Sequence, residues 1–183
     1  MTGSRQERWA EALALHASAT AGFAADAAAV VPERWAVPRA PGKWSPAQVV
    51  QHLILAYEVL LRELAGGPGM ALHATWWQRF LLRLIFLPRL LAGAPFPPGA
   101  RAPREVRPPE TAGDREEAVA RFRALAAEFT AAVEETRARS PRKRLTHAYF
   151  GATSLEDAVR LCARHIQHHR QQLPAPDAQP NAV

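Results

Sequence analysis

Apolar residues recur at steps of three and four along four long segments, and nowhere do they alternate at every second position. The segments cover residues 6–28, 46–65, 114–137 and 153–173 of the 183 in the chain. A step of three to four keeps side chains on one face of an α-helix, whereas a half-buried strand needs a step of two. The pattern therefore predicts an all-α protein, in which four amphipathic helices bury their apolar faces as a four-helix bundle without a sheet.

Capping residues and helix breakers mark the ends of two of these helices. The run Ser45-Pro46-Ala47-Gln48 supplies an N-cap, a proline in the first helical position and the last residue of a capping box. The Gly-Gly-Pro-Gly run at residues 66–69 stops this second helix. Thr153 and Glu156 form another capping box, so the last helix begins at residue 153 or 154 and ends before Pro174.

The lengths of the connections indicate the topology. Short links join antiparallel neighbours, but the span 66–113 is long enough to cross the bundle and return the chain to its starting end. The second and third helices can therefore run parallel. We expect one domain over residues 1–173, with residues 66–113 as a long crossover insertion, and a disordered tail over residues 174–183.

Positive charge is concentrated in that insertion. The chain carries 23 Lys and Arg against 17 Asp and Glu, a formal net charge of +6. Nearly the whole surplus lies between Leu72 and Pro109, where Glu105 alone opposes six arginines. No helix-turn-helix, zinc-finger or basic-aromatic pattern accompanies them, so we expect no nucleic-acid partner. The arginines are Arg79, Arg83, Arg89, Arg101, Arg104 and Arg107.

A single cysteine and the first residues indicate the compartment. One cysteine, Cys162, excludes an internal disulfide framework, and residues 1–7 lack the apolar core of a signal peptide. We therefore expect a cytoplasmic protein.

Two of the seven histidines share one face of the last helix. His165 and His169 are four residues apart, the spacing by which a helix presents two imidazoles to one cation. Apolar Ala158 and Leu161 lie on the same face, so the pair points into the bundle, where an unpartnered polar group costs roughly a few kcal/mol. Either a metal ion or hydrogen bonds to carbonyl groups must satisfy the two rings.

His52 lies at a matching depth on the second helix. It is six residues from the start of its helix, and His165 and His169 are on average six residues from the end of theirs. If these helices are antiparallel, the three rings meet at one level, because each residue advances a helix by about 1.5 Å. Three imidazoles without a fourth ligand are typical of an open metal site that keeps a position for water or substrate.

Other residues near this site are weaker candidates. Cys162 lies one turn before the helical pair and is either a soft ligand or, more commonly, a small buried hydrophobe. His168 points to the flank, where we expect a role beside the ligands or at the surface, and His147 precedes the last helix, so we expect it to be structural. The sequence indicates no partner for His16 or His73, no catalytic residue and no organic cofactor site.

The segment 73–91 within the insertion is at once aromatic, apolar and basic, with Trp76 and Trp77 ahead of a leucine-rich run. A membrane span needs about 20 apolar residues, and this segment is shorter and is interrupted by arginines and by Pro88. Lying flat in a membrane interface is one alternative. We expect instead that the segment packs on the bundle or in a dimer contact, covered by protein rather than by lipid.

Two runs resemble the motifs of a known family, the DinB-like metal-binding four-helix bundles. The run KWSPAQVVQHL at residues 43–53 looks like the opening of the family's second helix, and HIQHHRQQL at residues 165–173 looks like its final-helix signature. The run Tyr149-Phe150-Gly151 is similar to one subgroup of uncharacterised members. The resemblance covers the order of all four helices. By it, the family's metal triad matches His52, His165 and His169.

The resemblance implies an up-down-down-up bundle, frequently dimeric, that binds a divalent cation such as zinc or nickel. Characterised relatives include S-transferases and isomerases that use low-molecular-weight thiols, so a small-molecule substrate and a thiol are implied. Two departures border the expected pocket: Gln171 stands where many relatives have glycine, and the insertion from Met70 to Gly113 is longer than in the plain family. The substrate is therefore not carried over.

Two functions are compatible with these observations. The first is a metal-dependent transferase or hydrolase that activates a thiol or water at the open three-histidine site. Arg39, Lys43 and Trp44 precede the second helix near this site, where they either bind an anionic substrate or form a solvated loop that the tryptophan anchors. The alternative is a non-catalytic binding or membrane-peripheral protein that uses the basic aromatic residues 73–91. Imidazole suits zinc, nickel, copper and iron alike, so the sequence leaves the metal open.

Overall fold

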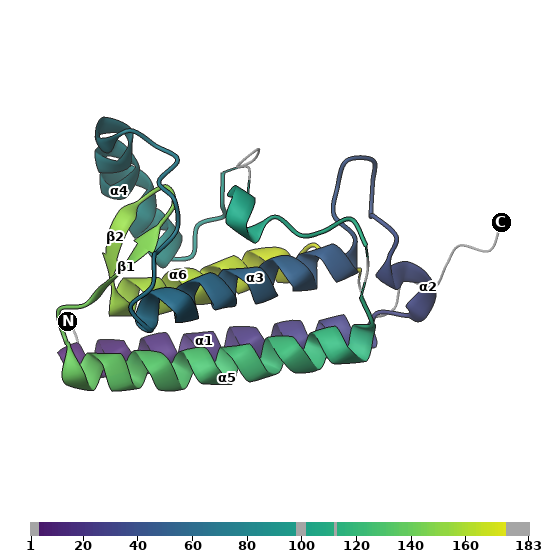
Figure 1. Ribbon diagram of the computed structural model, residues 1–183, viewed down its shortest axis with the longest axis horizontal. Coiled ribbons are helices and arrows are strands. Elements are labelled where there is room, and N and C mark those ends of the chain that lie inside the picture. Colours follow the sequence, from purple (N-terminus) through teal and green to yellow (C-terminus); the bar gives the residue numbers. More distant parts are fainter. Residues whose placement is uncertain (1–3, 98–101, 112, 175–183) are drawn as a thin grey trace.

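The structure is a computed structural model that describes residues 4–97, 102–111 and 113–174. Four long helices form the body of the molecule. Two of them run in one direction and the other two in the opposite direction, which gives the predicted up-down-down-up bundle (Figure 1). The first pair is α1 and α6 and the second is α3 and α5. Their bounds are Arg5–Ala29 (α1), Pro46–Leu64 (α3), Arg115–Arg139 (α5) and Leu155–Arg170 (α6).

Shorter elements occupy the connections between the long helices. A single helical turn precedes α3, a four-turn helix and a 3₁₀ turn lie between α3 and α5, and a hairpin joins α5 to α6 (Figure 1). Their bounds are Pro32–Trp35 (α2), Trp76–Leu91 (α4), Arg104–Val106 (η1), Arg144–His147 (β1) and Gly151–Ser154 (β2).

Capping boxes start two of the long helices. At α3 the Ser45 hydroxyl accepts the N–H of Gln48, and the Gln48 side chain accepts the N–H of Ser45, as the sequence predicts. Ser4 and Glu7 form the same arrangement at α1. These boxes satisfy backbone N–H groups that have no partner inside the helix.

The start of α6 lies one residue beyond the predicted capping box. Ser154 is the N-cap, and its hydroxyl accepts the N–H of Asp157. The hydroxyl of Thr153 does not cap the helix, because it donates a hydrogen bond to the carbonyl of Leu145 within the hairpin at 3.0 Å. The helix ends at Arg170, three residues before the predicted end.

The prediction that the chain contains no sheet is wrong for the residues between α5 and α6. There β1 and β2 pair as an antiparallel hairpin, with Arg144 opposite Ser154 and His147 opposite Gly151. Each strand has four residues, so an alternating pattern has too few repeats to be seen in the sequence. Gly151 has a φ of +69°, a conformation that glycine adopts without a steric penalty, which allows the tight reversal.

Alanines set how closely the helices approach. The face of α1 that turns inward carries Ala12, Ala19, Ala24 and Ala27, all buried, and α1 packs most closely on α6. The second close pair is α3 with α5. Small side chains allow backbones to approach, so the bundle is built from two tight pairs, and larger side chains fill the space between α3 and α6.

The insertion between α3 and α5 packs on the bundle by a few side chains. Leu87 and Leu90 of α4 contact Leu161 of α6 and Phe150 of the hairpin, and Val106 of η1 packs on α3. The sequence predicted that protein covers residues 73–91. In the described part of the chain, protein covers only the inner face of α4, and its outer face is exposed.

Two further expectations concern a membrane span and the tail. Among the described residues, no helix combines the length and the apolarity that a membrane crossing requires. The predicted disordered tail, residues 174–183, lies outside the described residues from position 175 onward.

Buried aromatic rings hold α1, α3 and α5 together, and truncating one of them should destabilise the fold. The Phe122 ring on α5 is fully buried, and its centroid lies 4.9 Å from that of Phe23 and 5.7 Å from that of Tyr57. Phe122→Ala leaves a cavity at this junction and should lower the free energy of unfolding by about 3–5 kcal/mol. Denaturant unfolding measures the loss, and Arg123→Ala on the exposed side of α5 should change it by less than about 0.5 kcal/mol.

Candidate metal centre

Three histidines from two helices converge near one end of the bundle. His52 lies in the second turn of α3, and His165 and His169 lie in the last turns of α6, which runs antiparallel to α3. His165 Nε2 is 3.1 Å from His52 Nε2 and 2.9 Å from His169 Nε2. The three side chains offer nitrogen atoms that all lie within 4.8 Å of one another. The structure thus brings together the three residues that the matched depths predicted.

Hydrogen bonds on the outer side of two rings fix which nitrogen faces inward. His52 Nδ1 lies 2.6 Å from the carbonyl oxygen of Val106, so it must carry a proton and donate it. His169 Nδ1 donates likewise to the Gln172 side-chain oxygen at 2.9 Å. In a neutral imidazole the other nitrogen is then an acceptor, so the Nε2 atoms of His52 and His169 both point a lone pair at His165.

Protons within this cluster cannot satisfy every nitrogen. His165 Nε2 carries at most one proton, and two acceptors face it at hydrogen-bond distance. At least one buried lone pair is left without a donor from the three rings, and such a group is costly to bury. A cation between the rings would satisfy all three nitrogens at once.

The distances and protonation states fit a divalent metal. A tetrahedral zinc ion with bonds of about 2.0–2.1 Å holds its ligand nitrogens roughly 3.3 Å apart, within a few tenths of an ångström of the two separations seen here. Burial lowers the pKa of His52 to about 4 and that of His169 to about 3, and it holds the pKa of His165 well below its usual range. All three rings are therefore neutral at pH 7, the form that coordinates a metal.

Two aromatic side chains border the three imidazoles. The Trp44 ring lies 4.8 Å from the His52 ring and is stacked on the His169 ring at 6.0 Å, measured between centroids. Phe96, from the chain that follows α4, lies 5.8 Å from the His165 ring. These apolar walls restrict water around the nitrogens, which strengthens any electrostatic interaction between them.

The other histidines have partners of their own. His168 is half-buried and accepts a hydrogen bond from the side-chain amide of Gln172, outside the convergent set, as predicted for a flanking residue. His16 is buried in the core, where its Nε2 lies 2.7 Å from the Tyr57 hydroxyl. His147 accepts backbone N–H groups in the hairpin turn, a structural role. Its ring also stacks on Phe150, which packs against Leu161 of α6.

Cys162 stays outside the cluster of nitrogen ligands. It packs against the main core as a small apolar residue. Burial raises the pKa of its thiol to about 12, so at neutral pH it carries a proton and is not the thiolate that binds metals. The interpretation of Cys162 as a hydrophobe therefore fits the structure better than that of a soft ligand.

Residues that hold the ligands in place were missed by the sequence analysis. Gln172 follows His169 by three residues, so a helical contact between them was available as a signal in the sequence. Val106 and Phe96 carried no such signal, because they come from the insertion and reach the site only through the way the chain crosses back over α3 and α6.

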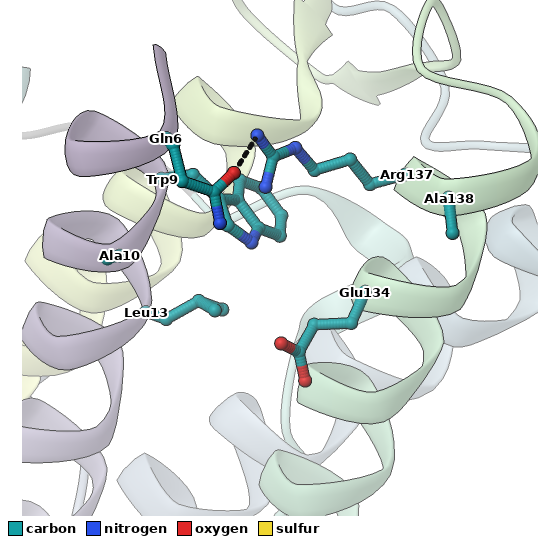
Figure 2. Close-up of a pocket in the computed structure, with 7 residues that line it drawn as sticks. All are labelled: Gln6, Trp9, Ala10, Leu13, Glu134, Arg137 and Ala138. Atoms are coloured by element: carbon teal, nitrogen blue, oxygen red, sulfur yellow. Dashed lines mark hydrogen bonds between the residues drawn. The ribbon is translucent and has the colours of Figure 1, made fainter. Parts of the chain in front are cut away.

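An open groove of about 480 Å³ lies elsewhere on the molecule, between α1 and α5 (Figure 2). Small side chains at Ala10 and Ala138 help to leave this space. Arg137 closes one side, because it donates to the Gln6 side chain and lies 4.5 Å over the Trp9 ring. The groove lies at the first turns of α1, at the opposite end of the bundle from the three histidines. It is therefore separate from the candidate metal centre.

The fold is a four-helix bundle, and the ring nitrogens of three of its histidines converge as candidate metal ligands. A family model described as the DinB superfamily matches residues 12–173, so the chain belongs to the DinB superfamily and the resemblance of its motifs is confirmed.

A solved structure also resembles the chain. Its title reads "YfiT from Bacillus subtilis is a probable metal-dependent hydrolase with an unusual four-helix bundle topology". It shares 15% sequence identity with this chain at a TM-score of 0.58, over 94% of this chain and 87% of that one. At this identity the likeness shows a common fold. No curated protein matches the chain significantly.

Metal affinity should depend on the hydrogen bond between Gln172 and His169. Gln172→Leu keeps the size of the side chain and removes the oxygen that accepts from His169 Nδ1, so the ring loses its preferred tautomer and orientation. We expect zinc affinity to fall about 10 to 100-fold, the range typical of partners that orient a ligating histidine. Competition with a chromophoric chelator measures the affinity.

The neighbouring glutamine is a matched control for this substitution. Gln171 is exposed at the same helix end, so Gln171→Leu should bind zinc like the wild type. Equal losses for the two variants would show that the effect is one of general helix stability.

Acid should destabilise the metal-free protein through its buried neutral histidines. Burial lowers the pKa of His16 from 6.5 to about 4. Between these two pH values His16 is mostly protonated in the unfolded chain and mostly neutral in the folded chain. The free energy of unfolding therefore falls as the pH falls through this window, by about 1 kcal/mol at about pH 5.5 for His16 alone. Denaturant unfolding across the window should show a shallower slope for His16→Gln than for the wild type.

Proposed function

We propose that this protein is a metal-dependent enzyme, a hydrolase or a transferase, in which His52, His165 and His169 hold a divalent cation and leave one coordination position open. Zinc and nickel are the metals we expect. The observation that carries the proposal is the convergence of three Nε2 atoms that their own protons cannot satisfy. The likeness to a structure described as a probable metal-dependent hydrolase supports it.

The chemistry at such a site is nucleophile activation. A divalent cation bound by three imidazoles lowers the pKa of a coordinated water or thiol and so supplies a nucleophile near neutral pH. The residues of this chain keep the imidazoles neutral by burial and hold two of them in one tautomer through Val106 and Gln172. Trp44 and Phe96 limit the access of water.

A small anionic molecule is the substrate class that we propose. Arg39 is exposed near the site and contributes to the low pKa of His168, and Lys43 is exposed beside Trp44. These two cations place positive charge near the histidines, which attracts an anion. A low-molecular-weight thiol is one such molecule, and it would make the reaction an S-transfer.

The proposal extends to the setting in which the protein works. We place it in the cytoplasm because it has one cysteine. A homodimer is implied by the family resemblance, and sedimentation of the purified protein tests it.

Replacement of each proposed ligand should reveal one shared cation. His52→Ala, His165→Ala and His169→Ala each leave two imidazoles, so metal affinity should fall by orders of magnitude in all three. His168→Ala should lower it by about 10 to 100-fold at most, since that ring packs on Phe96 and His169 and bonds to Gln172 but lies outside the convergent set. Elemental analysis of protein purified without an affinity tag, followed by zinc titration, measures these losses.

Controls separate binding from folding and from catalysis. Each variant should keep the helical circular dichroism spectrum, because the core that surrounds Phe122 lies outside the site. Wild-type binding by His52→Ala would remove α3 from the site and contradict the proposal. If the wild type holds its metal but neither hydrolyses ester and amide substrates nor transfers thiols, the enzymatic part fails and the binding part stands.

A further inference from the structure

The outer face of α4 is a continuous apolar surface without a partner in the described part of the chain. The exposed fraction is 71% for Trp76, 54% for Trp77, 52% for Phe80 and 64% for Leu84. Only Leu87 and Leu90 of this helix are buried, where it rests on α6 and the hairpin. Contiguous apolar patches of this kind are rare on soluble monomers and mark sites of interaction.

The helical period separates this face from the charges of α4. At 3.6 residues per turn, Trp77, Leu81 and Leu84 fall on the centre of the outer face, with no charged residue among them. Arg83 and Arg89 fall on its two borders, roughly a third of a turn from the centre on either side. Arg83 donates to the carbonyl of Ala152 in β2, so this border is held against the hairpin.

The stretch of chain that carries this face has charges of one sign. The sequence contains no Asp or Glu between Glu63 and Glu105, whereas this stretch holds five arginines. Glu105 is itself engaged, because it accepts the N–H of Ala71. The outer face of α4 is apolar and bordered by arginines. It is therefore complementary to a partner that offers apolar groups to its centre and anionic groups to its borders.

A second copy of this chain is a poor match for that surface. In a two-fold dimer the same patch meets itself, so the positive borders of one copy would face those of the other. Like charges placed opposite each other across an interface are destabilising, and the segment carries no carboxylate to offset them. The anionic headgroups of a bilayer supply the missing charge, and its acyl chains accept the apolar side chains.

We propose that α4 lies flat in the interface of an anionic lipid bilayer and holds the protein at the membrane surface. The apolar side chains enter the boundary between headgroups and acyl chains, and Arg89 meets lipid phosphates at its border. Trp76 and Trp77, at the start of the helix, suit this depth because an indole ring is apolar with one polar N–H. The helix binds at the surface and does not cross.

Cosedimentation of the full chain with vesicles tests this proposal. Wild-type protein should pellet with phosphatidylcholine vesicles that contain about 30% phosphatidylserine, the anionic lipid of a cytoplasmic leaflet, and less with phosphatidylcholine alone. High salt should weaken the binding, and the fluorescence of the exposed tryptophans should shift to shorter wavelength when they leave water.

Two pairs of variants separate the apolar and the electrostatic contributions. Leu84→Glu should lower the partition coefficient at least tenfold, whereas Val37→Glu, an exposed apolar position on the loop before α3, should leave it unchanged. Arg89→Glu should lower it at least about fivefold, whereas Arg123→Glu changes the net charge equally on exposed α5 and should have a much smaller effect. All four positions are exposed, so each variant should keep the wild-type helical spectrum.

Three outcomes would overturn the proposal. The first is wild-type protein that stays in the supernatant with both vesicle types, and the second is binding of Leu84→Glu equal to that of the wild type. The third is a dimer in sedimentation velocity that Leu84→Glu dissociates. The last outcome would assign the face to contacts between copies of the chain. None of these results bears on metal binding by the histidines, since α4 contributes none of the three proposed ligands.

Discussion

Two imidazole lone pairs directed at a third imidazole are the interaction on which the proposed centre depends. His52 and His169 each donate outward from Nδ1, so their Nε2 atoms cannot both be satisfied by the single proton that His165 can present. The arrangement leaves a buried lone pair without a donor, and a cation between the three rings would satisfy it. Outer hydrogen bonds to Val106 and Gln172 are therefore as much a part of the centre as the rings, because they decide which nitrogen faces inward.

The bundle supplies the space for these rings by packing its helices unevenly. Alanines such as Ala12 and Ala19 let α1 approach α6, and α3 pairs closely with α5. Between α3 and α6 the separation is larger, and imidazoles span it. The parallel order of α3 and α5 requires a long crossover, and that crossover returns past the histidines, where it provides the carbonyl of Val106 and the ring of Phe96.

The same insertion carries most of the positive charge and the exposed apolar helix. Leu87 and Leu90 fix α4 to α6, and the short chain after α4 leads to Phe96 beside His165. A helix attached through one face and exposed on the other adds surface without entering the main core. The proposed membrane contact uses residues of α4, whereas the proposed metal ligands lie on α3 and α6, so substitutions on the outer face of α4 leave the ligands unchanged.

Periodicity, capping residues and histidine spacing were enough to predict the four helices, their order and the level at which His52 meets His165 and His169, because each depends on local geometry that repeats along a helix. The hairpin escaped prediction since four-residue strands are too short to show a period. Tautomers, the partner of His52 and the exposure of α4 depend on which distant segments meet. The sequence by itself determined which residues share a helix face, and only the tertiary structure decided what each face contacts, because contacts between segments are set by the packing of the whole chain.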